Sequence, residues 1–490
     1  MTDREQQGTD DGRLTRRRFV VAASGAVAAA GLHGVPALAK PASRGEREPF
    51  AVVADSHLDP FSPDHSDNMR AVFDHILARS ERPAFVEHVG DVVEIGFPEE
   101  YAEWRRVRPD ALVDLIRAVP GNHEVRWDEF AKELYFAEFE QTPYSFDAAG
   151  VHVVALDPTQ LLQEPGFFSR AQLEWLREDL KRAGQDVPSV VFVHYPMSGD
   201  YLYVGNQEEF LRAVEGFDVR AVVAGHIHRQ EVMRVNGITS VTLPGILNTA
   251  AYHWVTPVTG ADGADALAIT LAQRGAAGWQ ETPVVEIPVE GERRALRRAP
   301  KLRTEVAGDR SSVEVVADLH PAQDADAARA RFVPESVFGG RSSAGWTALA
   351  PEQGGRRWRG TVDASALAAG LHELQVQASD GDARFEATEA VELPATATDR
   401  LRLAWEKDLV TAIQAGLAPL PDDRLVAATV GGAVVALDAG GSQPSERWRR
   451  EAAGPVYGTP ATDPEGRRVF VPTATGVVHA FDAADGREAW

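Results

Sequence analysis

The sequence predicts an α/β domain, followed by a β-sandwich and an incomplete β-propeller. Between residue 50 and about residue 256, short apolar runs alternate with amphipathic segments, which is typical of α/β domains. From residue 300 to 395, strand-like runs follow one another with turn residues between them. From residue 400 to 490, a strand-rich pattern repeats with a period of roughly forty residues, which is typical of propeller blades.

Apolar periodicity places the elements of the α/β domain, predicted to span residues 49–290. Buried strands are predicted at five apolar runs, 50–54, 85–89, 151–156, 190–193 and 220–224. Helices are predicted over 69–78, 99–117 and 169–183. The last of these begins with a capping box made by Ser169 and Gln172. Its leucines, Leu173, Leu176 and Leu180, lie on one face, as expected for a helix that packs on a sheet.

The region 300–395 is predicted to be a β-sandwich of immunoglobulin-like type. Strands are predicted over 313–317, 358–362, 373–378 and 383–391. The sequence Ser379-Asp380-Gly381-Asp382 between the last two fits a hairpin turn. The cysteine pair of antibody domains is absent, and a small barrel is the alternative architecture.

The region 400–490 contains an internal repeat. Residues 424–439 match residues 468–483, and Trp405, Trp448 and Trp490 recur at nearly even spacing. This pattern resembles the PQQ-enzyme-like propeller repeat. Two repeats cannot close a ring, because a propeller has at least about four blades. We therefore expect either a truncated propeller or a remnant of one, and the resemblance does not imply that a quinone is bound.

Composition restricts the classes of function. Acidic residues number 73 against 50 basic ones, for a net charge of −23, and no segment is basic throughout. Wrapping of nucleic acid is therefore not favoured. The chain has no cysteine, which excludes disulfides and thiolate metal sites. Any metal ion must bind to oxygen and nitrogen ligands.

The first 39 residues look like a twin-arginine signal peptide. Arg16 and Arg17 precede a small-residue apolar run over 21–32, and Ala37-Leu38-Ala39 supplies an A-x-A cleavage site. The alternative is an N-terminal membrane anchor, but the apolar run is short for a bilayer span. The resemblance implies export by the twin-arginine machinery to the periplasmic, cell-wall or extracellular space. The mature protein is expected not to span a membrane.

Five short polar motifs each follow a predicted strand or apolar run. In chain order they are Asp55-Ser56-His57, Gly90-Asp91-Val92-Val93-Glu94, Gly121-Asn122-His123-Glu124, His194 and Gly225-His226-Ile227-His228. Open α/β sheets place their ligands at the carboxyl ends of strands. Neutral imidazole and carboxylate groups suit divalent or trivalent ions such as Mn, Fe or Zn. The motifs therefore predict a metal site at one end of the domain.

The ordered set of motifs resembles the calcineurin-like metallophosphoesterase family over roughly residues 49–256. The resemblance implies a sandwich of two mixed sheets flanked by helices, and an exported hydrolase that cuts phosphate esters with two metal ions and a metal-activated water. Asp91 would bridge the two ions. The other ligands would be Asp55, His57 and His228 for the first ion, and Asn122, His194 and His226 for the second.

The resemblance also implies two catalytic residues. His123 would contact the substrate phosphate and protonate the leaving oxygen, and Glu94 would orient His123, with Glu124 as a competitor for that role. The other histidines, such as His65, are expected to be structural. The substrate stays open between phosphomonoesters, phosphodiesters and polymeric phosphoesters.

Differences from the family pattern indicate which subfamilies the chain resembles less. Ile95-Gly96 stands where the protein-phosphatase branch has Arg-Gly, and Val125-Arg126 stands where exported 5′-nucleotidases usually continue with Phe-Asp. No tyrosine ligand of the purple-acid-phosphatase type follows Gly90-Asp91. Ser56-His57-Leu58 resembles the start of bacterial cyclic-nucleotide phosphodiesterases.

The sequence lacks the motifs of two other enzyme classes. The chain has no G-x-S-x-G sequence and no P-loop lysine motif, so serine-hydrolase and NTP-driven chemistry are disfavoured. The remaining alternative is a non-catalytic extracellular binding or scaffold protein with a degenerate esterase domain. A degenerate domain would usually have lost a ligand, and all seven are present here.

Overall fold

The computed structural model describes most of the chain beyond the N-terminal segment. The described residues are 47–127, 131–197, 203–259, 263–290, 299–321, 323–333, 345–381, 383–395, 404–411 and 413–490. The predicted signal peptide, residues 1–39, lies outside them. Ala39–Ala404 form one compact unit, and Trp405–Trp490 belong to another. In the described part of the chain, no helix has both the length and the apolar character needed to cross a membrane.

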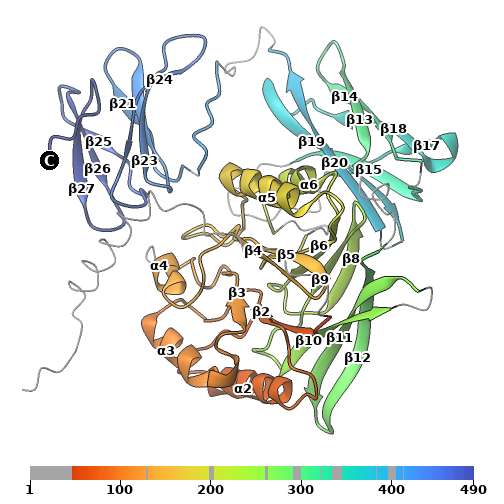
Figure 1. Ribbon diagram of the computed structural model, residues 1–490. Helices are drawn as coiled ribbons and strands as arrows, with labels where there is room; N and C mark the ends of the chain where they lie inside the picture. The colour runs from red at the N-terminus through yellow and green to blue at the C-terminus, as the bar shows by residue number, and fades with distance from the viewer. Residues whose placement is uncertain are drawn as a thin grey trace, which may run out of the picture. The chain divides into compact units, whose positions relative to one another are not determined.

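The α/β domain consists of two mixed sheets with helices on both outer faces (Figure 1). The first sheet has the order β12 (Gly278–Pro288), β11 (Asp265–Gly275), β10 (Ala251–Thr259), β1 (Phe50–Val53), β2 (Val86–His88) and β3 (Ile116–Ala118). The second contains β8 (Glu231–Val235), β9 (Ile238–Thr242), β7 (Val219–Ala224), β6 (Ser189–Phe192), β5 (Val151–Ala155) and β4 (Tyr144–Ala148). This arrangement confirms the predicted pair of mixed sheets flanked by helices.

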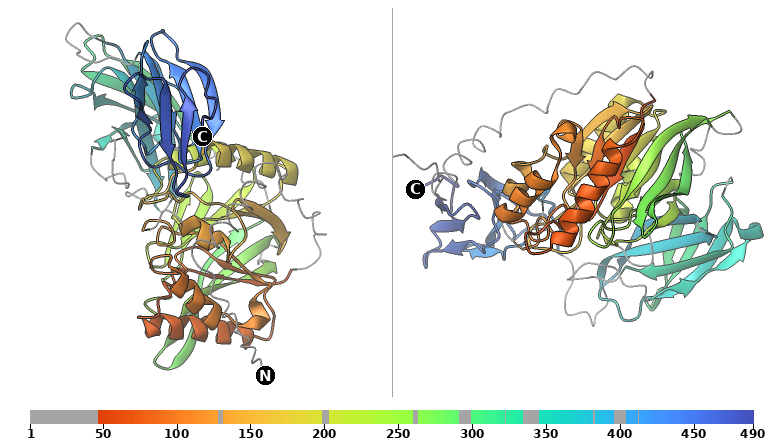
Figure 2. Two further views of the ribbon diagram at one scale, coloured as in Figure 1. Left: turned by 90° about the vertical axis from the view of Figure 1, so that its left-hand side faces the viewer. Right: turned by 90° about the horizontal axis from the view of Figure 1, so that it is seen from below.

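Each sheet has its own pair of helices. The first sheet is covered by α2 (Pro63–Leu77) and α3 (Pro98–Val107), and the second by α5 (Arg170–Ala183) and α6 (Gln207–Val214). In the right-hand view of Figure 2, α2 and α3, in red and orange, form a layer of their own beside the strands. A further short helix, α4, spans Ala131–Phe136.

Alternating side chains explain why both faces of the central strands are buried. In β1, Phe50 and Val52 point into the core between the two sheets, and Ala51 and Val53 point toward the helices. Strand β6 repeats the pattern, because Val190 and Phe192 face the inner core whereas Val191 faces α5 and α6. Successive side chains of a strand point to opposite faces, so a continuous apolar run is required here.

One predicted helix was too long. The helix predicted over 99–117 ends at Val107, is followed by a 3₁₀ turn at Asp110–Leu112, and gives way to β3 at Ile116. Pro109 explains the break, because a proline disfavours helical backbone at the residue before it. Arg108 accordingly has extended backbone angles. The predicted cap of α5 is confirmed, since the Ser169 hydroxyl accepts a hydrogen bond from the Gln172 N–H.

The region predicted as a β-sandwich consists of two sheets that share one apolar core. One sheet contains β13 (Lys301–Val306), β14 (Ser312–Asp318), β18 (Arg357–Asp363) and β17 (Ala350–Glu352). The other contains β16 (Thr347–Ala348), β15 (Ala327–Phe332), β19 (Gly370–Asp380) and β20 (Ala383–Leu393). The predicted hairpin is confirmed, because Asp380 pairs with Ala383. The immunoglobulin-like assignment stays a prediction.

The sandwich continues the second sheet of the α/β domain. Strand β20 pairs in parallel with β8, so ten strands form one sheet across both regions. At this junction the Asn236-Gly237 turn between β8 and β9 is buried against β20. The Asn236 backbone N–H donates to the Arg384 carbonyl at 2.8 Å, and its side chain exchanges hydrogen bonds of 2.8 and 3.0 Å with the Glu386 backbone. The two regions are therefore joined by main-chain pairing.

This junction predicts where the chain tolerates truncation. A chain ended at Pro394 should keep its stability, because residues before that point supply the complete cores of the α/β domain and the sandwich. A chain ended at Glu290 should lose about 2–4 kcal/mol, because the three hydrogen bonds of Asn236 are lost at about 1 kcal/mol each and the edge of β8 is uncovered. Urea unfolding of the two truncated chains measures the difference. Equal stability would show that the sandwich does not support the sheet.

The C-terminal unit contains the two predicted repeats as two small antiparallel sheets. The first has the order β21 (Ala418–Leu420), β22 (Arg424–Ala428), β23 (Ala433–Asp438) and β24 (Ser445–Glu451), and the second has β25 (Ala461–Thr462), β26 (Arg468–Pro472) and β27 (Val478–Asp482). The repeated tryptophans make equivalent bonds. The Trp405 indole donates to the Ala439 carbonyl, and the Trp448 indole donates to the Ala483 carbonyl. The prediction of repeated propeller-type blades is confirmed.

A buried histidine joins β4, β5 and α5. His152 bonds through Nδ1 to Asp147 at 2.7 Å and through Nε2 to Asp179 at 2.9 Å. Ser145 and Arg182 also donate to Asp179. Burial alone would lower the pKa of His152, but the hydrogen bonds and charges of the two carboxylates raise it above its ordinary value. The two carboxylates therefore favour the charged form of His152.

This cluster predicts a pH-dependent contribution to stability. A histidine whose folded pKa is raised contributes stability that is fully present below the unfolded pKa of about 6.5 and is lost as pH rises through the folded pKa. His152→Ala should therefore cost about 1–3 kcal/mol at pH 5.5 and less at pH 9. Val153→Ala is the control, because it removes only apolar contacts. Urea unfolding at both pH values checks this, and a larger cost of His152→Ala at pH 9 would contradict it.

Candidate metal centre

The predicted ligands lie on the loops that follow the carboxyl ends of five strands. Asp55, Asp91 and Asn122 follow β1, β2 and β3 of the first sheet, and His194 and His226 follow β6 and β7 of the second. Backbone hydrogen bonds tie adjacent loops together, from Asp55 N–H to the Gly90 carbonyl at 3.1 Å and from Gly225 N–H to the His194 carbonyl at 3.0 Å. Both sheets therefore contribute side chains to one site.

The backbone at this site is unusual. Positive φ angles occur at five of the predicted ligands, namely Asp55 (53°), His57 (45°), Asp91 (52°), His226 (71°) and His228 (53°). Such angles are uncommon for residues other than glycine, and they cluster at functional sites. The loops hold these side chains in position at a conformational cost.

Four of the side chains form a first group. One ligand atom from each of Asp55, His57, Asp91 and His228 lies within 4.8 Å of the others. His57 Nε2 is 3.6 Å from Asp91 Oδ2, and His228 Nε2 is 3.6 Å from Asp55 Oδ1. The Nε2 atoms of His57 and His228 face each other at 3.2 Å. Two nitrogens and two carboxylates thus point toward a common centre.

A second group shares Asp91 with the first. His194 Nε2 is 3.2 Å from Asp91 Oδ2, and His226 Nδ1 is 3.2 Å from His194 Nε2. Asn122 Oδ1 lies 2.9 Å from each of these two histidine nitrogens. All seven predicted ligands therefore converge, and the Asp91 carboxylate belongs to both groups.

Three observations show that the site fits metal ions. Oδ2 of Asp55 is buried and has no hydrogen-bond partner among the described residues, so it is free to accept an ion. A Cβ atom added to Gly121 would lie 2.2 Å from Asp91 Oδ1, and one added to Gly225 would lie 2.6 Å from Asp55 Oδ2. Any larger residue at these two positions would therefore clash with a ligand carboxylate. The donor set of imidazole, carboxylate and amide oxygen suits borderline ions.

Neighbouring groups orient the histidine rings. His57 Nδ1 bonds to Glu94 Oε2 at 2.8 Å, and His194 Nδ1 donates to the Val89 carbonyl at 2.9 Å. In both rings Nε2 is left for an ion. Such partners behind a ligating histidine fix its tautomer and raise its basicity.

The side chain of Glu94 lies beside two histidines, His57 and His123. Its short hydrogen bond is to His57, and its distance to His123 Nδ1 is 3.5 Å. His123 Nδ1 instead donates to the Glu94 backbone carbonyl at 2.7 Å. His123 also packs edge-on against His57, with ring centroids 4.3 Å apart. The carboxylate of Glu94 therefore lies behind a ligand, and the backbone of the same residue orients His123.

Glu124 has a structural role that the sequence did not indicate. Its buried carboxylate accepts backbone N–H groups from Asp91 at 3.0 Å, Val93 at 2.9 Å and Gly121 at 2.6 Å. It therefore joins the loops after β2 and β3 and does not orient His123. The only sequence signal was its place in the Gly121-Asn122-His123-Glu124 motif, where a carboxylate beside a histidine suggested a different partner.

Burial and neighbouring charges shift the pKa values of the ligands in opposite directions. Burial raises the pKa of Asp55 to about 7. Burial alone would lower the pKa of His194, but the adjacent Asp91 raises it to about 9. Burial lowers the pKa of His226 to about 3 and of His228 to about 4. His226 and His228 are thus neutral at pH 7, the form in which imidazole binds metal.

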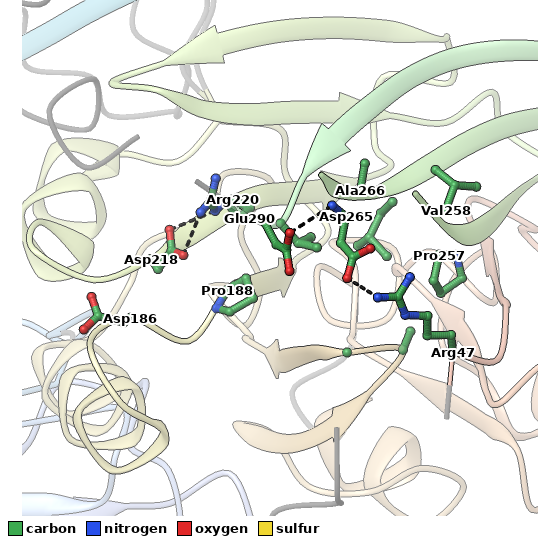
Figure 3. Close-up of a pocket in the computed structure, with 14 residues that line it drawn as sticks. Arg47, Asp186, Pro188, Asp218, Arg220, Pro257, Val258, Asp265, Ala266 and Glu290 are labelled. Carbon is green, nitrogen blue, oxygen red and sulfur yellow. Dashed lines mark hydrogen bonds and ion pairs between the residues drawn. The ribbon is translucent and has the colours of Figure 1, made fainter. Parts of the chain in front are cut away.

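A cavity of about 750 Å³ lies elsewhere in the domain, near the amino ends of β6 and β7 (Figure 3). Its lining includes Pro188, Asp218 and Arg220, and none of the predicted ligands. The charges pair within the lining, because Arg220 bonds to Asp218 at 2.9 Å and Arg47 bonds to Asp265. The cavity is thus separate from the carboxyl-end site.

Comparison with known proteins supports the assignment of both regions. Residues 48–230 match the family of calcineurin-like phosphoesterases. Residues 394–490 match a family described as outer membrane protein assembly factor BamB, which supports the propeller-type repeats.

Curated relatives match the α/β domain. A "Probable cyclic nucleotide phosphodiesterase" of Rhodococcus erythropolis is 28% identical over 36% of this chain and 61% of its own length. A glycerophosphodiester phosphodiesterase of Enterobacter lignolyticus is 28% identical over 35% of this chain and 66% of its length. A cAMP/cGMP dual specificity phosphodiesterase of Mycobacterium tuberculosis is 27% identical over 34% of this chain and 55% of its length. The chain thus spans less than two thirds of each relative.

Proposed function

We propose that the calcineurin-like phosphoesterase domain of residues 48–230 is a metal-dependent phosphoester hydrolase with a dinuclear centre. The observation that carries this proposal is the convergence of seven side chains, one of which, the Asp91 carboxylate, belongs to both ligand groups. Asp55, His57 and His228 would hold one ion with Asp91, and Asn122, His194 and His226 would hold the other. Two such ions supply Lewis acidity toward phosphoryl oxygens and lower the pKa of water.

The protein's own residues complete the site. His123 Nδ1 donates to the Glu94 carbonyl, so the opposite nitrogen, Nε2, faces away from that anchor, where it accepts a hydrogen bond from Arg126 Nη2 at 2.9 Å. Burial lowers the pKa of His123, while the charge of Asp91 opposes this shift. An imidazole beside the phosphate can exchange a proton with a leaving group. We assign His123 as the acid, a role in which Nε2 would carry a proton in place of the hydrogen bond that it accepts from Arg126.

The substrates of the relatives favour phosphodiesters. The three relatives are named for cyclic nucleotides or glycerophosphodiesters, and Ser56-His57-Leu58 follows the pattern of the cyclic-nucleotide enzymes. We therefore propose a small phosphodiester as the natural substrate, with monoesters as the second class.

A metal analysis combined with a substrate panel tests the proposal. Purified protein should contain close to two equivalents of Mn, Fe or Zn, and chelation should remove its activity. Bis-p-nitrophenyl phosphate, cyclic AMP and p-nitrophenyl phosphate report on the substrate class. Protein that contains full metal but hydrolyses none of them would favour the alternative, a non-catalytic binding protein.

We also propose that the protein is exported by the twin-arginine pathway, from the sequence around Arg16 and Arg17. Replacing both arginines by lysine should leave unprocessed protein in the cytoplasm. Immunoblots of cell fractions follow the cleavage expected after Ala39. Normal processing of the double mutant would contradict this route.

A further inference from the structure

Arg126 lies beside the residue assigned as the acid. Its backbone N–H donates to the Asn122 carbonyl at 2.9 Å, one turn after that ligand, and its Nη2 donates to His123 Nε2 at 2.9 Å. A permanent positive charge therefore contacts the atom of His123 that is placed to meet the substrate. The motif assignment gave this arginine no role.

Arg126 is held from two sides. Its guanidinium lies over the ring of Trp127, 4.7 Å from the centroid, and it forms an ion pair with the carboxylate of Glu164. Glu164 also accepts from the Asn122 side-chain amide at 3.2 Å. The carboxylate thus lies between the guanidinium and a predicted ligand.

The loop that carries Glu164 is fixed in place. The Tyr195 hydroxyl donates to the Glu164 carbonyl at 3.0 Å, and Gly166 N–H donates to the Tyr203 carbonyl at 2.9 Å. Both tyrosine rings pack against His226, with centroids 4.9 and 4.8 Å away. The position of Glu164 is therefore coupled to the ligand shell.

The guanidinium retains capacity for another acceptor. Nε of Arg126 is buried and makes no hydrogen bond among the described residues, while the side chain as a whole remains 21% exposed. An arginine has five donors in a planar fork that suits phosphate oxygens. In the structure, however, Glu164 neutralises its charge.

We propose that the Arg126–Glu164 ion pair determines the preference of this site between phosphodiesters and phosphomonoesters. The inference rests on the proposed function. With the pair intact, the local charge cancels and the site suits a diester, which carries one negative charge. When Arg126 is freed from Glu164 it binds a non-bridging phosphate oxygen, and a monoester, with a charge of about −1.5 to −2 at pH 7, gains most.

Two variants with opposite effects test the proposal. Glu164→Gln should free the guanidinium and raise the ratio of kcat/KM for p-nitrophenyl phosphate to that for bis-p-nitrophenyl phosphate about 10-fold. Arg126→Gln should lower the same ratio about 10-fold, because it leaves the Glu164 carboxylate uncompensated and that negative charge opposes the more highly charged monoester. The two substrates share a leaving group, so the ratio reports the charge of the phosphate. Arg126→Lys should recover part of the ratio.

Phosphate binding provides a readout that does not depend on turnover. Calorimetry with inorganic phosphate on the metal-loaded protein should show about 10-fold weaker binding for Arg126→Gln and tighter binding for Glu164→Gln. Metal content should not change in either variant. Arg359→Gln is a matched control, because it removes an arginine that pairs with Glu352 at 3.0 Å within the β-sandwich.

The outcomes separate this inference from the proposed function. Equal effects on both substrates, or shifts of the two variants in the same direction, would overturn the role of the ion pair while leaving hydrolysis intact. Metal-loaded protein whose phosphate affinity shifts as expected in the two variants, but which cleaves neither ester, would overturn hydrolysis and leave the effect of the ion pair on anion binding standing.

Discussion

Asp91→Asn should remove metal and activity together. The Asp91 carboxylate lies 3.6 Å from His57 Nε2 and 3.2 Å from His194 Nε2, so it faces both groups of ligands. Two cations held close together repel each other, and a shared negative charge offsets that repulsion. An amide keeps the shape but removes the charge. We expect kcat/KM to fall by at least about 10³-fold, beyond the loss of a single electrostatic stabiliser.

Asn122→Ala is the matched comparison for this prediction. Asn122 Oδ1 contacts only His194 and His226 among the ligand nitrogens, so its loss should deplete mainly one of the two ions. Plasma emission analysis after dialysis counts the ions in each variant. The folding of Asp91→Asn should be near normal, because the amide oxygen can still accept the His123 backbone N–H. Two fully occupied sites in Asp91→Asn would disprove the shared ligand.

The position of the site could be predicted from the sequence because each motif and the strand before it are adjacent in the chain. Each motif directly follows an apolar run, and the carboxyl ends of neighbouring parallel strands meet at one edge. β1, β2 and β3 pair in parallel, as do β6 and β7, so the loops after the strands of each sheet had to lie side by side. Periodicity also located the β19–β20 hairpin and the blades, whose strands pair with near neighbours.

The contacts between distant parts of the chain could not be predicted from the sequence. Nothing local to Asn236 or Glu386 indicates that β8 and β20 pair, because they lie 150 positions apart. The direction of the Glu94 side chain depends on the loop after β2, where a turn of the backbone sends the carboxylate to His57 and the carbonyl to His123. Spacing alone could not distinguish these two atoms of one residue.

The environment of Glu94 changes what its substitution should do. Because the carboxylate bonds to His57, Glu94→Gln should weaken metal binding, by the 10- to 100-fold typical of a group behind a ligand. The loss of activity in Glu94→Gln should not depend on the leaving group of the substrate. This separates Glu94, on the loop after β2, from His123, on the loop after β3.

His123→Ala should retain both ions and lose activity in proportion to the difficulty of the leaving group. His123 Nδ1 is occupied by the Glu94 carbonyl, and Nε2 faces Arg126 at 2.9 Å and not the ligand groups around Asp91. Loss of a general acid costs on the order of 10²–10⁴ in rate. An alkoxide needs that proton, whereas a nitrophenolate leaves without it because its conjugate acid is strong.

The measurement compares an alkyl phosphate ester with a p-nitrophenyl ester of the same charge. The alkyl ester should show the full loss of about 10²–10⁴-fold in His123→Ala, and the nitrophenyl ester a much smaller one. Arg126→Gln is the control, because it removes charge beside the same imidazole and should affect both esters of equal charge alike. A uniform loss in His123→Ala would mean that His123 grips the phosphate through Nε2, and that the leaving oxygen takes its proton from another group.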